Sequence, residues 1–241
     1  MPEPLTFVLI PGAWHGGWAW HPVAQRLRAA GHKALCVTLP GMSDGDDRTG
    51  LGLEDAARHV VDEIESRGIT QVVLVGHSLG GLTLGTVASR LRDRVSTMIF
   101  FGAVVPVPGR SMNDENRPEI AAYVKGSIEN SPDGSIEIPL AGFRDDLMRN
   151  QPEAAVRLIH NLLAPAPGGY FLDSYDGPDV NSLGIPVAYV LADDEGALPL
   201  PGREMAARLA VEPISVPGPH EAMLTHPDEV QKALVEHSCK L

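Results

Sequence analysis

The stretch from residue 72 to residue 81, Val-Val-Leu-Val-Gly-His-Ser-Leu-Gly-Gly, restricts the fold more than any other part of the chain. Four apolar residues typical of a buried strand run directly into a Gly-x-Ser-x-Gly motif and then into residues able to start a helix. So tight a turn places Ser78 in strained backbone geometry and exposes its side chain at the carboxyl end of a sheet. The helix N-terminus there directs free N–H groups toward an oxyanion. We therefore predict that Ser78 is a nucleophile.

Short apolar runs alternate with longer amphipathic segments along most of the chain, which indicates an α/β fold with a mostly parallel sheet and helices on both faces. The predicted strands are residues 7–10, 34–39, 72–75, 95–101, 187–191 and 213–216. Between them, helices are predicted from Pro22 to Gly31 and across the apolar stripe from Leu53 to Ile64, which Gly68 closes.

Between about residues 106 and 182 the pattern changes to many Pro, Gly, Asn and Asp residues, with one clear amphipathic helix near residues 154–163. We interpret this stretch as a short, mainly helical cap inserted into a single domain of residues 1–241. Its larger side chains either line a substrate pocket or form the core of the cap. These candidates are Met112, Tyr123, Phe143, Leu147, Leu158 and Tyr170. An exposed apolar patch on the cap would indicate a homodimer.

The loop after the first predicted strand, residues 11–20, is where a second oxyanion donor is expected. We predict that the backbone N–H groups of Ala13 and Leu79 bind the developing negative charge. Gly12 lets backbone approach the substrate, and Trp14 either contacts substrate or packs with the other two tryptophans of the loop. His15 either shapes the loop through a hydrogen bond or contacts substrate.

The general base has to be chosen by position, because the chain has 9 histidines. His220 follows the last predicted strand through Pro-Gly-Pro and precedes a final helix beginning near Pro227. A histidine on such a loop reaches Ser78 from the carboxyl side of the sheet. His226 adjoins Pro227 and is expected only to start that helix, so His220 is the predicted base.

These motifs together resemble the small α/β-hydrolases related to plant methylesterases and hydroxynitrile lyases, with their bacterial esterase relatives. The resemblance spans nearly the whole chain and is weakest in the cap. It implies cofactor-free chemistry on an ester or cyanohydrin in a mostly apolar pocket. It is carried by residues 9–18, 39–41, 76–80 and 220–224.

Two positions separate the esterases from the lyases of this family. The similar lyases carry a lysine after the catalytic histidine and a threonine early in the oxyanion loop, where this chain has Glu221 and Gly12. An acidic Glu221 cannot attract a departing cyanide, so ester chemistry is favoured. Glu221 is also unusual for an esterase, and we count it among the candidate substrate contacts.

The third member of a catalytic triad should follow the predicted strand at residues 187–191. The chain reads Ala-Asp-Asp-Glu-Gly-Ala-Leu-Pro there, and bacterial relatives typically show Gly-x-x-Asp before Ala-Leu-Pro. That pattern implies Glu195, while a shift of one residue would deliver Asp194 and a further shift Asp193. Whichever carboxylate it is must accept the hydrogen bond from the other nitrogen of His220.

Composition excludes several other classes of protein. A formal net charge of -12 repels a phosphate backbone, so nucleic acid is not an expected partner. The chain lacks a signal-peptide pattern and an apolar run of about 20 residues, which favours a cytoplasmic protein without membrane contact. Cys36 and Cys239 are expected to be unpaired thiols. We find no metal-ligand spacing and expect no metal and no cofactor.

The sequence thus predicts a serine hydrolase that cleaves a carboxylic ester, lactone or thioester of a small apolar molecule through an acyl-enzyme. Two alternatives stay open. One is a lyase or cyclase that uses the same oxyanion hole without hydrolysis, and the other is a ligand-binding protein that keeps the fold without useful turnover.

Overall fold

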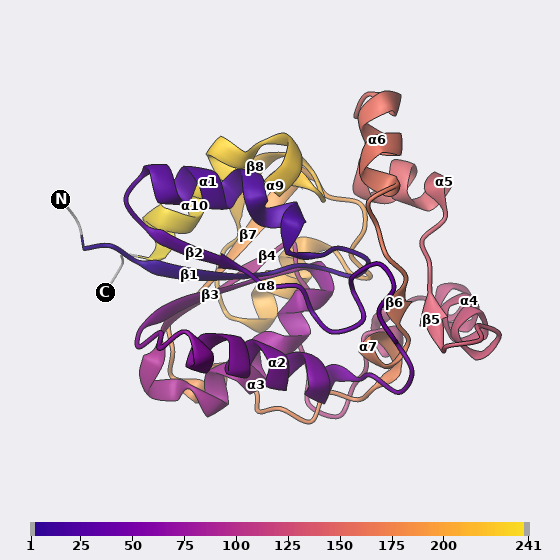
Figure 1. Cartoon of the computed structure of the whole chain (residues 1–241), viewed down its shortest axis with the longest axis horizontal. Helices are drawn as coiled ribbons and strands as arrows, with labels where there is room; N and C mark the ends of the chain where they lie inside the picture. Colours follow the sequence, from indigo (N-terminus) through magenta and orange to yellow (C-terminus); the bar gives the residue numbers. More distant parts are fainter. Residues whose placement is uncertain (1–2, 239–241) are drawn as a thin grey trace.

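The computed structural model describes residues 3–238, and its centre is a sheet of six parallel strands (Figure 1). Each strand pairs with its neighbours in parallel, and the order across the sheet is β2-β1-β3-β4-β7-β8. All six predicted strands are confirmed. They are β1 (Thr6–Ile10), β2 (Lys33–Cys36), β3 (Val72–His77), β4 (Val95–Phe101), β7 (Val187–Asp194) and β8 (Ile214–Pro219).

Helices cover both faces of this sheet (Figure 1). One face packs against α1 (His21–Ala29) and α10 (Pro227–Ser238), and the other packs against α2 (Leu53–Ser66), α3 (Gly81–Arg90) and α8 (Gly202–Arg208). These positions confirm the predicted α/β fold and its two layers of helices.

The α2 helix shows how the sequence produces this arrangement. Its apolar residues recur every four positions, so Ala56, Val60 and Ile64 lie on one stripe, and all three are fully buried. Burying a side chain the size of Val60 or Ile64 contributes about 1.5–3 kcal/mol. Glu54 and Asp55 lie in the first turn, where their negative charges interact favourably with the positive end of the helix dipole.

The segment predicted as a cap is mainly helical and projects beyond the carboxyl edge of the sheet (Figure 1). The predicted amphipathic helix is α6. A short antiparallel pair of strands, β5 and β6, was not predicted. The elements are α4 (Pro118–Glu129), β5 (Ser135–Ile136), α5 (Leu140–Gly142), a π-helical turn (Phe143–Leu147), α6 (Glu153–His160), β6 (Ala166–Pro167) and α7 (Gly169–Leu172).

The remaining helical elements are short. They are α9 (Ala222–Thr225) and the 3-10 turns Gly17–Trp20, Ser78–Gly80, Arg92–Arg94, Asn113–Glu115 and Val180–Leu183.

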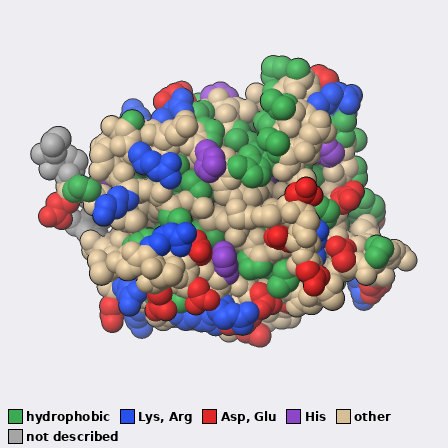
Figure 2. All heavy atoms as spheres, in the orientation of Figure 1, with side chains coloured by type: hydrophobic (Ala, Val, Ile, Leu, Met, Phe, Trp, Pro, Cys, Tyr) green, Lys and Arg blue, Asp and Glu red, His purple; other side chains and the backbone are tan. Residues whose placement is uncertain are grey.

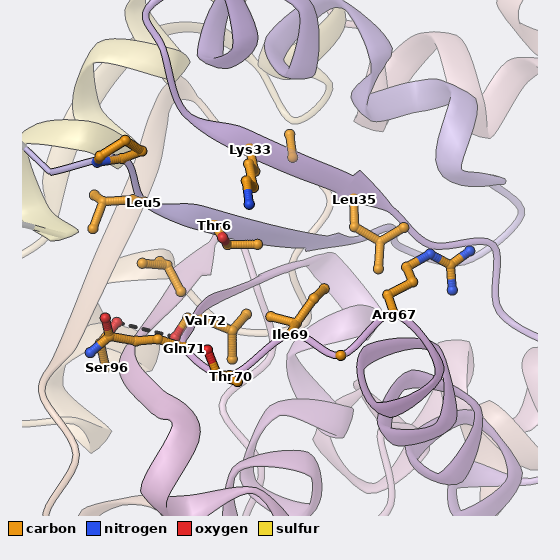
Figure 3. A pocket seen from close by; sticks show the side chains of 14 residues that line it. Leu5, Thr6, Lys33, Leu35, Arg67, Ile69, Thr70, Gln71, Val72 and Ser96 are labelled. Carbon is orange, nitrogen blue, oxygen red and sulfur yellow. Dashed lines mark hydrogen bonds between the residues drawn. The ribbon is translucent and has the colours of Figure 1, made fainter.

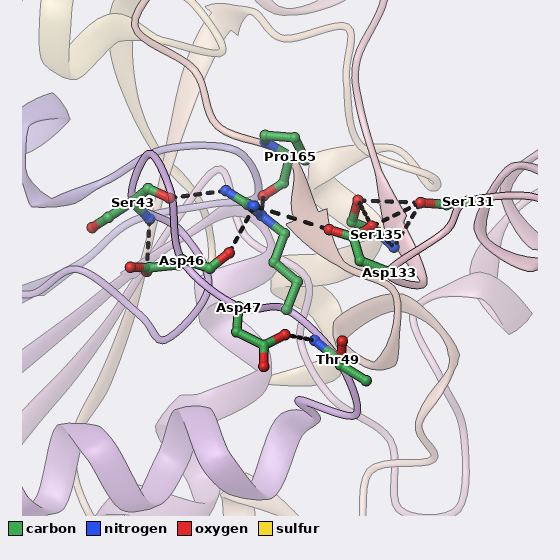
Figure 4. Close-up of polar contacts among 9 residues, drawn as sticks. Ser43, Asp46, Asp47, Thr49, Ser131, Asp133, Ser135 and Pro165 are labelled. Carbon is green, nitrogen blue, oxygen red and sulfur yellow. Dashed lines mark hydrogen bonds and ion pairs between the residues drawn. The ribbon is translucent and has the colours of Figure 1, made fainter.

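One arginine joins the cap to the loop that follows β2. Arg48 is only 9% exposed, and its guanidinium donates to the backbone carbonyls of Ser43, Asp46 and Pro165 at 2.8, 2.9 and 2.9 Å. Its Nη1 also lies 4.0 Å from the carboxylate of Asp133 in the cap (Figure 4). The cap is therefore tethered to the sheet domain by a buried cation as well as by the two chain connections.

The surface of the cap carries a group of exposed apolar side chains among charged ones. Figure 2 shows hydrophobic side chains gathered over α6, where Leu158 and Leu162 are 65% and 55% exposed. These residues provide the exposed apolar surface on which the homodimer hypothesis depends, and that hypothesis stays a prediction. Within the described part of the chain, none of the helices has both the length and the apolarity needed to cross a bilayer.

The cysteine prediction is tested at one of its two positions. Cys36 is a free thiol on β2, and burial raises its pKa to about 11. Cys239 lies outside the described residues.

Candidate active site

Two loops that leave neighbouring strands in opposite directions frame the site. After β1 the chain forms β2 on one side of β1, and it then returns to form β3 on the other side of β1. The order of the strands therefore reverses between β1 and β3. Parallel α/β sheets bind ligands beside the carboxyl ends of their strands at such a reversal. A cavity of about 340 Å³ lies there, and Ala13, Ser78 and His220 all line it.

Ser78 occupies the strained turn that the sequence predicts. Its φ of 52° lies in the left-handed region, which a residue with a side chain adopts at a cost. The neighbouring backbone stabilises the turn, because the Val104 N–H donates to the Ser78 carbonyl at 3.0 Å. A Cβ atom at Gly80 would lie 2.6 Å from the carbonyl oxygen of Pro11, so only glycine allows this close approach. The half-buried serine is thereby held at the cavity, which it lines.

His220 lies at the end of β8 and is bound to a carboxylate at the end of β7. Its Nδ1 lies 2.9 and 2.8 Å from the two carboxyl oxygens of Glu195. Because an ionised carboxylate only accepts hydrogen bonds, Nδ1 carries the proton, and the lone pair of Nε2 is left available for Ser78. Glu195 also accepts from the backbone N–H of Ala197 at 2.8 Å, which fixes its orientation.

The two acids that precede Glu195, Asp193 and Asp194, bind groups other than His220. Asp194 accepts a hydrogen bond from the Nδ2 of Asn150 at 2.8 Å, and Asp193 accepts from the backbone N–H of Gly218 at 3.0 Å. Among the three acids considered from the sequence, Glu195 is the one that contacts His220. The pairing of β7 with β8 is irregular between Ala192 and Asp194, and Glu195 directly follows this irregular end of the strand.

Burial and charge set the protonation of this pair. Burial acts to lower the pKa of His220, but the charge of Glu195, its hydrogen bond and the charge of Glu221 outweigh that effect, so the pKa is raised above 6.5. Burial acts in turn to raise the pKa of Glu195, and its contacts with His220 and two backbone N–H groups outweigh burial and lower it. The favoured resting state at neutral pH keeps Glu195 ionised and in position to stabilise an imidazolium.

The predicted oxyanion loop lies beside Ser78. Ala13 lines the cavity, and Leu79 follows the nucleophile in the turn that starts α3. A Cβ atom at Gly12 would lie 2.7 Å from the Cβ of Ser78, so the backbone approaches the nucleophile at a distance only glycine permits. A threonine at position 12, as in the similar lyases, would collide with the nucleophile. Trp14 also lines the cavity and packs against Phe171, and its contact with substrate stays a prediction.

Two predicted substrate contacts lie elsewhere. His15 is 1% exposed and Glu221 is 0% exposed, and neither belongs to the cavity lining. The Nδ1 of His15 donates to the carbonyl of Ala13 at 2.7 Å, which matches the alternative that this histidine shapes the loop. For Glu221 the expectation of substrate contact is wrong: this residue precedes the short helix α9, and its buried carboxylate lies 3.6 Å from the Nε2 of His15 instead of at the cavity.

The cavity wall is mostly apolar and comes largely from the cap. Three of the six predicted candidates line it, whereas Phe143 and Tyr170 are fully buried in the protein core and Leu158 is exposed. The apolar lining residues outside the oxyanion loop are Met112, Ile120, Tyr123, Val124, Ile136, Ile138, Pro139, Leu147, Phe171, Ala197, Leu198 and Pro199. Charged residues at its edge include Arg117 and Asp146, and burial raises the pKa of Asp146.

Sequence reasoning missed His77, although it lies inside the Gly-x-Ser-x-Gly motif. His77 is fully buried under the catalytic histidine, with ring centroids 4.5 Å apart, and its Nε2 lies 3.2 Å from the carbonyl of His220. Since a carbonyl only accepts, this nitrogen donates. Burial lowers the pKa of His77 well below 6.5, so the ring is neutral and supports the base by a hydrogen bond. In the sequence, the position of His77 at the end of a buried strand was the feature that could have indicated this role.

His77, His220 and Glu221 also bring ligand-type atoms within 4.8 Å of one another. The Nδ1 of His220 already contacts Glu195, and the Nε2 of His77 already donates to the backbone carbonyl of His220. We therefore assign this cluster to the acid–base arrangement.

A second cavity, of about 530 Å³, lies at the opposite edge of the sheet (Figure 3). The strands begin there, and the side chains around it include Thr6, Lys33, Arg67 and Gln71. The catalytic residues lie at the carboxyl edge instead, so this cavity is separate from the site described above.

A parallel sheet with a strained serine after β3, a carboxylate after β7 and a histidine after β8 defines the class of α/β-hydrolases. The comparison with known proteins agrees. The chain belongs to the alpha/beta hydrolase family, whose model matches residues 7–233, and this confirms the predicted resemblance.

Two relatives of this chain are named as esterases. The chain is 39% identical to the carbendazim hydrolyzing esterase of Nocardioides sp. (strain SG-4G) over 109 residues, which are 44% of this chain and 45% of that protein. It is 30% identical to methylesterase 18 of Arabidopsis thaliana over 190 residues, 71% of this chain and 72% of that protein. The match therefore spans less than half the length of the first of these relatives.

A solved structure is similar over nearly the whole chain. It is an extracellular alpha/beta-hydrolase from a Paenibacillus species, described as sharing structural and functional homology with tobacco salicylic acid binding protein 2. The TM-score is 0.91 at 27% sequence identity, over 97% of this chain and 99% of that one.

Proposed function

We propose that this protein is a serine esterase that hydrolyses a carboxylic ester of a small apolar molecule through an acyl-enzyme. The observation that carries the proposal is a cavity lined by both His220, which pairs with Glu195, and Ser78, which is held at a φ of 52°. The esterase names of the relatives support the same reaction.

In the first step the Ser78 Oγ attacks the ester carbonyl while the Nε2 of His220 accepts its proton. The carbonyl electron pair moves onto oxygen, and the N–H groups of Ala13 and Leu79 stabilise that oxyanion. Glu195 stabilises the imidazolium. When the pair returns to the carbonyl, the bond to the alcohol breaks and His220 gives its proton to the departing oxygen.

In the second step water attacks the acyl-enzyme. His220 takes a proton from the water, the same N–H groups bind the second oxyanion, and collapse releases the acid and restores the Ser78 hydroxyl. The same two steps apply to a lactone or a thioester, since each presents a carbonyl with a leaving group.

The lining of the cavity supports an apolar substrate. Aromatic side chains of Trp14 and Phe171 line a cavity of about 340 Å³, which matches small-molecule sites lined mainly by apolar groups. The walls from α4 and the π-helical turn bring the cap directly against the reacting centre. We propose that the cap selects the acyl or alcohol group.

The testing experiment measures the intact mass of wild type and of Ser78→Ala after treatment with a fluorophosphonate. We expect wild type to gain one adduct and to hydrolyse a short-chain p-nitrophenyl ester, and the variant to do neither. Removing the nucleophile of such a triad lowers kcat by about 10⁶-fold.

Thermal unfolding of both proteins is the control that the variant is folded. A wild type that stays unmodified by the fluorophosphonate would contradict the proposal and favour a non-hydrolytic enzyme or a binding protein. A variant that still hydrolyses the ester would exclude Ser78 as nucleophile.

A further inference from the structure

The carboxylate of Glu221 is buried without a conventional partner. Its exposure is 0%, and within residues 3–238 neither of its oxygens has a hydrogen-bond partner. Its Oε1 lies 3.6 Å from the Nε2 of His15, which is also buried and also lacks a hydrogen bond among the described residues. Because an isolated buried charge is costly, these two groups have to satisfy each other.

The other nitrogen of His15 determines where the proton lies. Its Nδ1 is 2.7 Å from the carbonyl oxygen of Ala13, and since a carbonyl only accepts, Nδ1 donates. In a neutral ring Nε2 would then present a lone pair to an ionised Glu221, which is repulsive. One further proton between the two groups removes that repulsion, whether it is assigned to the ring or to the carboxyl.

We propose that Glu221 and His15 form a second acid–imidazole pair, sharing one proton, that positions the oxyanion loop. The inference rests on the proposed function, because it assigns the pair a role in oxyanion binding. Both are positioning residues. Neither touches the substrate cavity, and they act through the Ala13 carbonyl that His15 holds.

The surroundings of His15 leave its ring a single orientation. Trp18 and Phe143 lie against it with ring centroids 5.5 and 6.2 Å away. The loop it holds is strained, since Trp14 has a φ of 67°. A left-handed non-glycine residue costs of order 1–3 kcal/mol and persists only where contacts enforce it. The hydrogen bond from His15 to Ala13 is such a contact.

The sequence position of Glu221 gives the pair a second effect. Glu221 directly follows His220, and its backbone N–H donates to the carbonyl of Leu147 in the cap at 3.3 Å. One short segment therefore carries the catalytic base, anchors the oxyanion loop through His15 and contacts the cap wall.

The test compares two ligands of the same shape, a phenylethyl trifluoromethyl ketone and the corresponding methyl ketone. The fluorinated ketone forms a reversible hemiketal: the Ser78 Oγ bonds to carbon, its proton passes to His220, and the carbonyl pair becomes an oxyanion. The methyl ketone reports binding of the carbonyl form. The ratio of the two dissociation constants therefore measures the oxyanion site separately from the pocket.

In Glu221→Leu we expect the fluorinated ketone to bind about 10- to 100-fold more weakly, while binding of the methyl ketone is unaffected. The upper end of this loss of affinity equals the effect of removing one oxyanion donor. kcat should fall by a similar factor with KM nearly unchanged. Glu221→Gln should restore most of the ratio, because its amide N–H can donate to the Nε2 of His15.

The double variant His15→Phe/Glu221→Leu replaces the buried pair with apolar side chains, a change that proteins often tolerate. If Glu221 acts through His15, the single variant His15→Phe and this double variant will show the same ratio. The double variant also keeps the test decisive if Glu221→Leu alone does not fold. Glu115→Leu is the matched control, since it removes a buried carboxylate that pairs with Arg208 and should lower Tm without changing the ratio.

An unchanged ratio in Glu221→Leu, or an equal loss in Glu221→Gln, overturns the proposal. Fluorophosphonate labelling of Ser78 distinguishes failure of the proposed esterase function from failure of the positioning role. If wild type is not labelled, the proposed esterase function fails. If wild type is labelled and the ratio does not change, only the positioning role fails.

Discussion

Glu195 and Asp194 are adjacent acids in different surroundings. Glu195 is buried against His220, whereas Asp194 is partly exposed and bound to Asn150. We expect Glu195→Gln to lower kcat by about 10³- to 10⁴-fold, because the histidine then loses the carboxylate that fixes its tautomer and stabilises the imidazolium. Steady-state hydrolysis of a p-nitrophenyl ester provides the measurement.

Asp194→Asn is the matched control, since it removes the neighbouring charge and leaves the His220 contact intact. Its kcat should stay within about twofold of wild type, the range typical of surface changes. A large loss in Asp194→Asn with activity retained in Glu195→Gln would reverse the assignment of the acid.

The protonation of His220 predicts the pH dependence of the reaction. The reaction needs the neutral imidazole, and the charge of Glu195 raises the pKa of this ring above 6.5. Activity should therefore be full at higher pH and fall as pH decreases through that raised pKa. We expect the acidic limb of the kcat/KM profile to have its midpoint above 6.5. A midpoint at or below 6.5 would show that Glu195 does not dominate the titration.

The catalytic residues differ in how far sequence alone could find them. Ser78 and His220 were predictable because a motif and a position after the last strand define them. The acid was not, because three carboxylates follow one another at the end of β7, where the pairing with β8 is irregular and simple alternation of side chains does not apply. The burial of Glu221 was not predictable either, since it depends on the direction of the turn that begins α9.

Among the elements, the link between the cap and the sheet domain depends strongly on Arg48. Three backbone carbonyls accept from its guanidinium. We expect Arg48→Ala to lower the free energy of unfolding by about 1–3 kcal/mol, the cost of leaving buried acceptors unsatisfied. Urea denaturation measures the loss, and amide hydrogen exchange should increase at residues 131–136 and 165–167.

Arg144→Ala is the control for this prediction. Arg144 is an exposed cap residue paired with Glu153, so its loss should cost much less than that of Arg48. If Arg48→Ala and Arg144→Ala lowered the free energy of unfolding equally, the link through Arg48 between the cap and the sheet domain would be contradicted.

The elements of the sheet were easier to predict than those of the cap. The strands of the main sheet are short and mostly apolar runs that alternate with longer amphipathic segments, so their composition and spacing identify them. The pair β5 and β6 has only two residues per strand, too short for any period to be visible. Their pairing is set by the turn around Asp133 and by the Arg48 contacts, which link distant parts of the chain.

At the scale of the whole molecule, the two edges of the sheet differ in function. The cavity at the amino edge contains Lys33 and Arg67, and the catalytic residues line the cavity at the carboxyl edge. We expect Arg67→Ala to keep kcat/KM within about twofold of wild type, as for an ordinary surface change. Phe171→Ala, in the carboxyl-edge cavity, should raise KM for the same ester.

Steady-state kinetics on both variants measure this difference. A strong loss in Arg67→Ala would mean that the amino-edge cavity communicates with the site.

The order of the strands also has a consequence for synthesis on the ribosome. The turn with Ser78 follows β3, but the acid and the base arrive only after β7 and β8, at the far end of the sheet. A nascent chain therefore carries its nucleophile for about 140 residues of further synthesis without a base to activate it, at roughly 5–20 residues per second. If Ser78, Glu195 and His220 act as proposed, we expect the growing polypeptide not to hydrolyse esters until its final strand has docked, so the onset of hydrolysis would report the docking of that strand.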